Sequence, residues 1–525
     1  MTTTVPVAPA KASRREWVGL AVIALPCLLY SMDLTVLNLA VPALSAALQP
    51  SAAQLLWIVD IYGFMVAGAL ITMGTLGDRI GRRRLLMIGA AAFGIASVLA
   101  AFSTSAEMLI ATRALLGLAG ATLAPSTLSL IRNMFHDPGE RTLAIGIWVS
   151  SYSVGAAIGP LIGGVLLEYF WWGSVFLVGV PVMLLLLIVG PVLLPEFRDP
   201  QAGPLDLLSA ALSLVAVLAT IYGLKQMAEQ GPSVWAASAI VAGVGLGAAF
   251  LRRQHGLADP LIDLKLFRRP AFNASLATYT LGCYTMFGAY IFIAQYLQLV
   301  LGLSPLVAGL WTVPWGLAFV VGSMLTPMLV RRFRPADVVA AGLAIAAAGF
   351  ALLAQAQASH GPEFVIGASV VLSLGLAPVF TLATDLIVGA APPERAGAAA
   401  AISETSAEFG GALGIAIFGS IGAAVYRSFV IDGLPASVPP EALDAARSTL
   451  GAASTAAARL PADVGAGLLA TSREGFMRGL RLNAWIAVAI MSGTAILAAT
   501  VLRRATGAHA GSGSETADAE RARLP

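Results

Sequence analysis

Charged residues are scarce in this 525-residue sequence: they make up 11% of it, whereas 58% of the residues are hydrophobic. A soluble globular domain has roughly 25% charged residues, and a chain with so few cannot cover a surface that faces water. The composition therefore excludes an ordinary soluble protein and places the chain in a lipid bilayer. The formal net charge of +3 is too small to indicate a nucleic-acid partner, so we expect none.

Cysteine and histidine are also rare. The two cysteines, Cys27 and Cys283, lie in apolar segments far apart in the sequence, and the four histidines are not spaced like metal ligands. These residues support neither a disulfide framework nor a metal site. They also offer no set of nucleophile, base and metal ligands for a membrane-embedded enzyme. We therefore expect a protein that is not an enzyme and that needs no cofactor.

The sequence is rich in apolar segments of about 20 residues, the length that an α-helix needs to cross a bilayer. Backbone groups find no partners in hydrocarbon, so such segments are expected to be helices. They predict an all-α integral membrane protein with fourteen transmembrane helices, near residues 17–46, 53–76, 85–104, 107–131, 142–167, 172–194, 206–226, 232–251, 272–301, 306–330, 337–357, 364–390, 397–426 and 480–502.

Arginine and lysine concentrate in alternate connections between these segments. The opposite short connections hold little more than Lys225, whereas basic residues occur near both ends of the chain and at 79–84, 132–141, 198, 252–269, 331–334 and 395. By the positive-inside rule, both termini are expected to be cytoplasmic. The long segment at about 428–479 is then external, and short amphipathic helices are expected there around residues 439–450 and 465–476.

Proline-rich linkers divide the spans into groups of six, two and six. GTLGDRIGRRRLL after the second span is echoed by GSMLTPMLVRRFRPAD after the tenth, the matching place in the second half. Two parallel halves are a transporter architecture, with the site between them near the midplane. The expected parts are a cytoplasmic N-terminus (1–16), an N-terminal six-helix bundle (17–200), a two-helix insert (201–255), a C-terminal six-helix bundle (256–503) and a disordered cytoplasmic tail (504–525).

Several motifs carry a family resemblance. GTLGDRIGRRRLL (Gly74–Leu86), LIATRALLGLAGA (Leu109–Ala121) and GAAIGPLIGG (Gly155–Gly164) resemble the loop, arginine and antiporter motifs of the major facilitator superfamily. MDLTVLNLAVPAL (Met32–Leu44) and YLQLVLGLSPLVAGL (Tyr296–Leu310) are similar to its fourteen-helix drug:proton antiporters of the QacA and SmvA type. The resemblance implies the major facilitator fold, a monomer that spans the bacterial cytoplasmic membrane many times, and export of small-molecule drugs in exchange for protons.

Two of these motifs contain candidates for a gate. A positive-inside anchor has no need of an acid, but an acid at a helix end can pair with arginines or a helix N-terminus in only one conformation. The resemblance assigns this role to Gly74, Asp78, Arg79, Gly81 and Arg82. In the antiporter motif, regularly spaced glycines allow close helix packing and a proline favours a bend. The resemblance assigns sealing of the substrate path to Gly155, Gly159, Pro160 and Gly163, with simple packing as the alternative.

Ionisable residues inside the spans are few, and each costs about 2.5–3.5 kcal/mol at a helix centre by insertion scales. Glu404 and Glu408 lie four residues apart on one helical face, so their charges repel and at least one is expected to hold a proton near neutral pH. Structural roles are the alternative for Asp33 and Arg113, and Asp385 is expected near a span end. The candidates for proton coupling are Asp33, Asp60, Arg113, Glu404 and Glu408.

Aromatic residues near these acids indicate the kind of substrate. An aromatic face beside a carboxylate binds a lipophilic cation by cation–π attraction and charge pairing. The substrate-binding candidates are Trp57, Asp60, Tyr62, Trp148, Glu404 and Glu408, with packing as the alternative for the tryptophans. We expect a proton-coupled antiporter that exports lipophilic, cationic drugs or antiseptics by alternating access. The alternative function is export of a specific neutral or anionic natural product, such as an antibiotic made by the host.

Overall fold

The computed structural model describes residues 11–50, 52–200, 205–230, 233–257, 260–433 and 438–503, and these contain helices, turns and loops but no strand. Fourteen helical segments are long and apolar enough to cross a membrane, which confirms the predicted all-α class and the number of spans. The expected disordered tail and most of the expected N-terminal segment lie outside the described residues.

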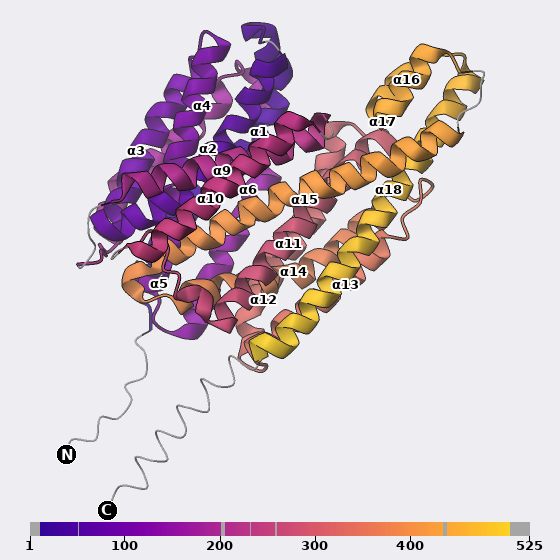
Figure 1. The fold of residues 1–525 in the computed structure, drawn as a ribbon. Coiled ribbons are helices and arrows are strands. Elements are labelled where there is room, and N and C mark those ends of the chain that lie inside the picture. Colours follow the sequence, from indigo (N-terminus) through magenta and orange to yellow (C-terminus); the bar gives the residue numbers. More distant parts are fainter. Residues whose placement is uncertain are drawn as a thin grey trace, which may run out of the picture.

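The N-terminal half, in indigo and purple in Figure 1, contains six of the spans. Two spans that the sequence predicts as single helices are interrupted: one breaks at Ala121 and Thr122, and the other at Val178. The helices are α1 (Arg14–Leu48), α2 (Ala52–Ile80), α3 (Arg82–Ala101), α4 (Ala106–Gly120), α5 (Leu123–Met134), α6 (Pro138–Tyr169), α7 (Ser174–Leu177) and α8 (Gly179–Leu193).

The insert and the C-terminal half follow in chain order. The insert is the pair α9 (Leu207–Gln230) and α10 (Val234–Gly256). The C-terminal half contains η1 (Leu266–Arg268), α11 (Pro270–Gln295), η2 (Tyr296–Val300), α12 (Pro305–Val330), α13 (Pro335–Leu353), α14 (Pro362–Ala390), η3 (Pro393–Arg395), α15 (Ala396–Gly433), α16 (Pro440–Ser448), α17 (Leu450–Ala457), α18 (Ala462–Leu497) and η4 (Ala498–Leu502).

Local sequence signals set where many helices begin. Proline is the first residue of α6, α11, α12, α13 and α14, a position where its missing N–H is not needed and its fixed φ suits the helix. At the start of α1, Ser13 and Glu16 form a reciprocal capping box, in which the Ser13 N–H donates to the Glu16 carboxylate at 2.7 Å. These signals explain why the spans start abruptly after short connections.

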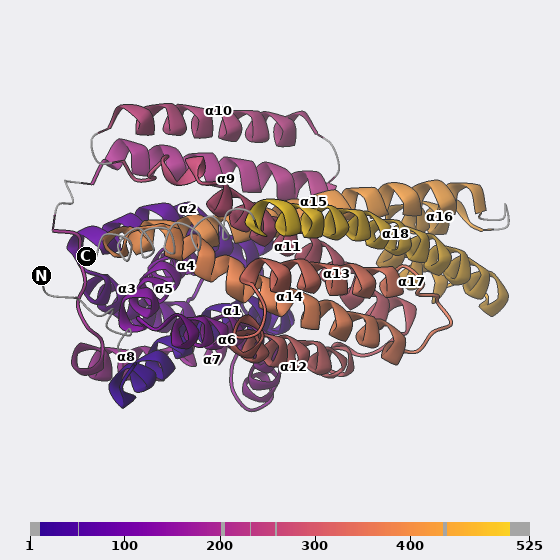
Figure 2. The same cartoon turned by 90° about the horizontal axis from the view of Figure 1, so that it is seen from below.

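Each half packs mainly on itself, and a few helices join the two halves. In the N-terminal half α1 packs on α6 and α2 on α4, whereas in the C-terminal half α11 packs on α15 and α13 on α14. The contacts between halves are made mostly by α6 with α12 and by α2 with α15. Figure 2 shows the insert as a separate layer: α9 lies over α2 and α15, and α10 lies outside α9.

The two ends of the described chain lie on one face of the bundle. The Ala12 N–H donates to Glu140 in the first turn of α6 at 2.7 Å, and Arg503 lies 3.6 Å from Asp337 in the first turn of α13. An even number of spans requires this arrangement. That this face is cytoplasmic stays a prediction from the basic residues.

The segment predicted to be external differs partly from expectation. The short helix expected around residues 439–450 is confirmed as α16, but the one expected around 465–476 is wrong, because those residues are the first part of the long helix α18. No proline interrupts the sequence between Ala462 and Leu497, so this helix continues without a break. The connection between the last two spans is therefore shorter than the sequence indicates.

Candidate functional site

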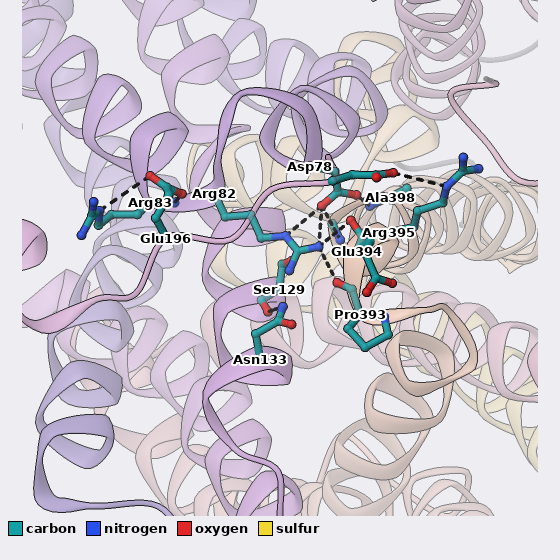
Figure 3. Close-up of polar contacts among 12 residues, drawn as sticks. Asp78, Arg82, Arg83, Ser129, Asn133, Glu196, Pro393, Glu394, Arg395 and Ala398 are labelled. Carbon is teal, nitrogen blue, oxygen red and sulfur yellow. Dashed lines mark hydrogen bonds and ion pairs between the residues drawn. The ribbon is translucent and has the colours of Figure 1, made fainter. Parts of the chain in front are cut away.

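Asp78 lies near the end of α2, where α2 meets the first turn of α15 (Figure 3). Its carboxylate accepts hydrogen bonds from the backbone N–H groups of Gly397 (3.1 Å) and Ala398 (3.0 Å) and from Arg82 Nε (2.8 Å). The N-terminal end of a helix carries partial positive charge, which stabilises a carboxylate there. Since α2 and α15 belong to different halves, this contact holds the halves together at one face.

Arg82 and two glycines complete the contact. The Arg82 side chain is buried and donates to the carbonyl oxygens of Pro393 (2.7 Å) and Glu394 (2.9 Å) in the other half. Gly81 has φ +110°, which a residue with a side chain adopts only with strain. A Cβ at Gly74 would lie 2.5 Å from the Gly397 carbonyl oxygen, so only glycine allows α2 this close to α15. Arg79 lines a small cavity beside the contact.

The linker after α8 braces the same contact, which sequence reasoning missed. Glu196 accepts hydrogen bonds from the backbone N–H groups of Arg83 (3.0 Å) and Arg84 (3.1 Å) in the first turn of α3. Asp199 donates its N–H to the Asp78 carbonyl oxygen at 2.6 Å, and its carboxylate lies 3.8 Å from Arg395 of the other half. The signal available in the sequence was the pair of acids in a linker otherwise rich in proline.

A second ion pair joins the halves at the same face. Arg141 Nε in the first turns of α6 donates to Asp385 Oδ1 at 2.7 Å, and the Thr142 hydroxyl donates to Asp385 Oδ2 at 3.0 Å. Asp385 lies near the end of α14, in agreement with its expected position near a span end. The Asp78 and Asp385 contacts together close this face of the structure.

The glycine motif in α6 produces close packing, but within one half. A Cβ at Gly155 would lie 2.1 Å from the Leu28 carbonyl oxygen in α1, so the helices approach closely there. Gly159 and Gly163 are buried in the same helix, and α6 continues as one helix through Pro160. Because α1 and α6 both belong to the N-terminal half, sealing of the path between halves stays a prediction.

Asp33 and Arg113 form an ion pair inside the N-terminal half. Arg113 Nη1 lies 2.5 Å from Asp33 Oδ2, and the guanidinium also donates to the carbonyl oxygens of Ile58 (3.0 Å) and Val59 (3.4 Å). The Tyr62 ring centroid lies 4.9 Å from the Arg113 guanidinium carbon. Arg113 is 0% exposed, so the structure holds this network rigidly around a fully buried guanidinium.

Asp60 pairs with Lys225, which the sequence interpretation wrongly assigns to a connection between spans. Lys225 lies inside α9, and its Nζ contacts the Asp60 carboxylate. Trp57, which is 41% exposed, stacks on Tyr222 of α9 with ring centroids 6.2 Å apart. Trp57 and Asp60 therefore face the insert, whereas Tyr62 faces Arg113, and the three do not form one binding surface.

Glu404 and Glu408 lie on α15 and are half-buried. The Tyr30 hydroxyl of α1 donates to Glu408 Oε1 at 2.6 Å, and the Tyr279 hydroxyl of α11 donates to Glu404 Oε1 at 3.5 Å. Neither carboxylate has a basic side chain within ion-pair distance in the described part of the chain. The Tyr30–Glu408 bond also joins the two halves.

Tyr30, which contacts Glu408, belongs to a cluster with Tyr62 and Tyr152, of which sequence reasoning missed Tyr30 and Tyr152. The Tyr30 ring centroid lies 5.9 Å from that of Tyr62 and 5.7 Å from that of Tyr152. Trp148 is only 1% exposed, donates from Nε1 to the Thr127 hydroxyl at 2.9 Å and packs 4.9 Å from Tyr152. Trp148 thus supports the cluster from behind, which fits the packing alternative. The signal was a tyrosine four residues after Trp148, on the same helical face.

Comparisons with known proteins agree with this architecture. The family model of the Major Facilitator Superfamily matches residues 23–415. Over 490 residues the chain is 44% identical to the multidrug efflux pump LfrA of Mycolicibacterium smegmatis, covering 93% of this chain and 97% of that protein. Over 465 residues it is 38% identical to the methyl viologen resistance protein SmvA of Salmonella typhimurium, covering 88% and 93%. The crystal structure of the human organic anion transporter MFSD10 matches with a TM-score of 0.59 at 14% identity, over 91% of this chain and 100% of that chain, and shows the fold alone.

Proposed function

Because the chain belongs to the major facilitator superfamily and is similar along most of its length to multidrug efflux pumps, we propose that it exports lipophilic cations in exchange for protons. It is a multi-pass transporter of the bacterial cytoplasmic membrane and not an enzyme. The proposal adds to this the charge of the substrate, the coupling ion and the residues that bind both.

The observation that carries the proposal is a division among the acids. Four aspartates already have a resident basic partner: Asp33 with Arg113, Asp60 with Lys225, Asp78 with Arg82 and Asp385 with Arg141. Glu404 and Glu408 instead meet tyrosine hydroxyls in the described part of the chain. A carboxylate in a membrane interior must be neutralised, and for these two the available means are a bound cation or a proton.

Under this proposal, protons and the substrate cation compete for the carboxylates of Glu404 and Glu408. When Glu404 and Glu408 are ionised, they attract a cation, and the rings around Tyr30 offer it cation–π contacts. When they take up protons, that attraction is lost and the cation is released. Proton entry then drives cation export, since each charge that moves through 100 mV contributes about 2.3 kcal/mol.

Alternating access requires the closed face to open. The Asp78 and Asp385 contacts must both break for the site to be reached from that face, because each of them joins the two halves. We assign this face to the cytoplasm from the distribution of basic residues. The described conformation is then the one in which the site is shut off from the cytoplasm.

The test measures protons released when a cation binds to detergent-solubilised protein, together with uptake of a labelled dication into proteoliposomes under an imposed pH gradient. We expect Glu404→Gln and Glu408→Gln each to lower proton release and to flatten the pH dependence of transport. Glu168→Gln, which removes an exposed acid at the end of α6, is the matched control and should behave like the wild type.

Two results would contradict the proposal. Cations that bind the wild type but release no protons at any pH would rule out competition at these carboxylates. Export of a neutral or anionic compound with no effect of Glu404→Gln would replace cation export with the natural-product alternative.

A further inference from the structure

The two-helix insert contributes a lysine that pairs with an acid of the N-terminal half. In Figure 2, α9 covers the boundary between α2 of one half and α15 of the other, and both contacts are extensive. Lys225 lies on the face of α9 that meets α2, where its Nζ contacts the Asp60 carboxylate. The insert is therefore part of the charge balance around α2 and not a passive appendage.

The surroundings of this pair resemble a cation site that is already filled. The Lys225 ammonium lies 5.0 Å from the centre of the Phe64 ring, and the neighbouring Trp57 and Tyr222 rings are nearly parallel, at 11°. A carboxylate with aromatic faces beside it is what a lipophilic cation requires. Here the ammonium of Lys225 occupies that position.

The Lys225–Asp60 pair differs from the Arg113–Asp33 pair in how firmly its cation is held. Arg113 is 0% exposed and donates to two backbone carbonyls besides Asp33. The Lys225 side chain is 32% exposed, and a lysine reaches its partner through a flexible four-carbon stem. Lys225 can leave Asp60 by rotating that stem, whereas Arg113 is also held by its hydrogen bonds to the Ile58 and Val59 carbonyl oxygens of α2.

We propose that Lys225 is a tethered cation that occupies Asp60 in the absence of substrate, and that a substrate cation displaces it. This inference rests on the proposed function only in taking the substrates to be cations. It makes the insert a determinant of charge selectivity, because the positive charge of Lys225 opposes binding of every cation near Asp60. Coulomb energy is proportional to the charge of the ligand at a given distance, so a compact dication with both charges near Asp60 is opposed about twice as strongly in free energy as a monocation.

The experiment measures equilibrium binding of tetraphenylphosphonium, a monocation, and methyl viologen, a compact dication, to the solubilised full chain. Removing the lysine charge in Lys225→Gln should tighten tetraphenylphosphonium binding by roughly threefold and methyl viologen binding by up to roughly tenfold, the square of the first factor, because the two charges of methyl viologen lie close together. Lys225→Arg keeps the charge and should stay near the wild type. Adding Asp60→Asn to Lys225→Gln should abolish the gain, since the freed carboxylate is its source.

Controls separate this charge effect from damage to the insert. Arg253→Gln also removes one positive charge and one ion pair from the insert, the pair with Asp206 at 2.8 Å, but away from Asp60, so it should leave both affinities unchanged. Lys225→Met is a second variant, an apolar residue of similar length that a membrane helix accommodates. Loss of the fold in Lys225→Gln and Lys225→Met, with Lys225→Arg intact, would identify a purely structural pair and overturn the proposal.

The remaining outcomes are distinguishable. Unchanged or weaker methyl viologen binding by folded Lys225→Gln would overturn the inference and leave the proposed function standing. Equal gains for the two cations would overturn it as well, because a charge effect must scale with ligand charge. A wild type that binds neither cation would contradict the proposed function itself.

Discussion

Asp78→Asn should open the closed face of the transporter without unfolding it. The carboxylate accepts from three donors, Arg82 and the N–H groups of Gly397 and Ala398. Asparagine has nearly the same shape, but one of its oxygens becomes an amide that faces a donor, and the negative charge is lost. A hydrogen bond to a charged group contributes about 1.5–3 kcal/mol, and the helix dipole about 0.3–1 kcal/mol.

The closed state is therefore expected to lose about 2–4 kcal/mol. At about 1.4 kcal/mol for each factor of ten, its population relative to the open state falls by roughly thirtyfold or more. Pulsed electron-electron resonance between spin labels at Arg84 and Arg331, both exposed at this face, measures the two populations. Transport should slow greatly, because a gate that rarely closes cannot alternate.

Glu394→Gln is the matched control for this variant. Glu394 lies in η3, the turn that accepts hydrogen bonds from Arg82, and its side chain is exposed. Only its backbone carbonyl binds Arg82, so the variant removes a charge without removing a hydrogen bond. Well-folded Asp78→Asn protein with the wild-type distance distribution and wild-type transport would show that the Asp78 contact does not act as a gate. In that case the loop is a positive-inside anchor.

Three further predictions concern other contacts, two at the closed face and one in the insert. Gly74→Ala should also open the closed face, because its Cβ would lie 2.5 Å from α15 backbone, and the same spin-label distances report it. Arg141→Gln and Asp385→Asn should each shift the gate toward the open state, and the double variant by less than the sum, because both remove one ion pair. The Arg253 guanidinium hydrogen-bonded to Asp206 holds the pKa of that carboxyl well below its usual range. The pair therefore stabilises the insert above about pH 4 and loses this effect as pH falls toward the lowered pKa, so the difference in melting temperature between wild type and Asp206→Asn should narrow between about pH 6 and about pH 3.

Much of the fold follows from local sequence signals. Apolar length predicts all fourteen spans, because a bilayer imposes one length on every helix that crosses it. The motif resemblance to drug efflux transporters of the major facilitator superfamily is confirmed. Residues that interact along one helix are equally readable: Glu404 and Glu408 share α15 as their spacing requires.

Contacts between distant parts of the chain are not readable in this way. A periodic pattern shows which residues share a helix face, but not which other helix that face meets. Lys225 and Asp60 are 165 residues apart and Tyr30 and Glu408 are 378 apart, so each pairing is decided only when the helices pack. The sequence interpretation assigns Lys225 to a connection, although it lies inside α9, because a lone lysine near a span end satisfies the positive-inside pattern of either side.

The Asp78 contact and the proposed binding carboxylates Glu404 and Glu408 are joined by one helix. Ala398, which binds Asp78, and Glu404 lie six residues apart on α15, about 9 Å along a helix that contains no proline. Movement of the first turn of α15 away from Asp78 must therefore carry Glu404 with it, and the Tyr30–Glu408 bond resists that movement from the other half. Coupling of this kind is reciprocal: if protons on the carboxylates shift the gate by some factor, the gate must shift proton binding by the same factor. We expect Asp78→Asn to displace the pH dependence of cation-induced proton release, although Asp78 itself binds neither ion. Glu394→Gln should leave that dependence in place, and an unchanged profile in Asp78→Asn protein with an open gate would show that Ala398 and Glu404 move independently.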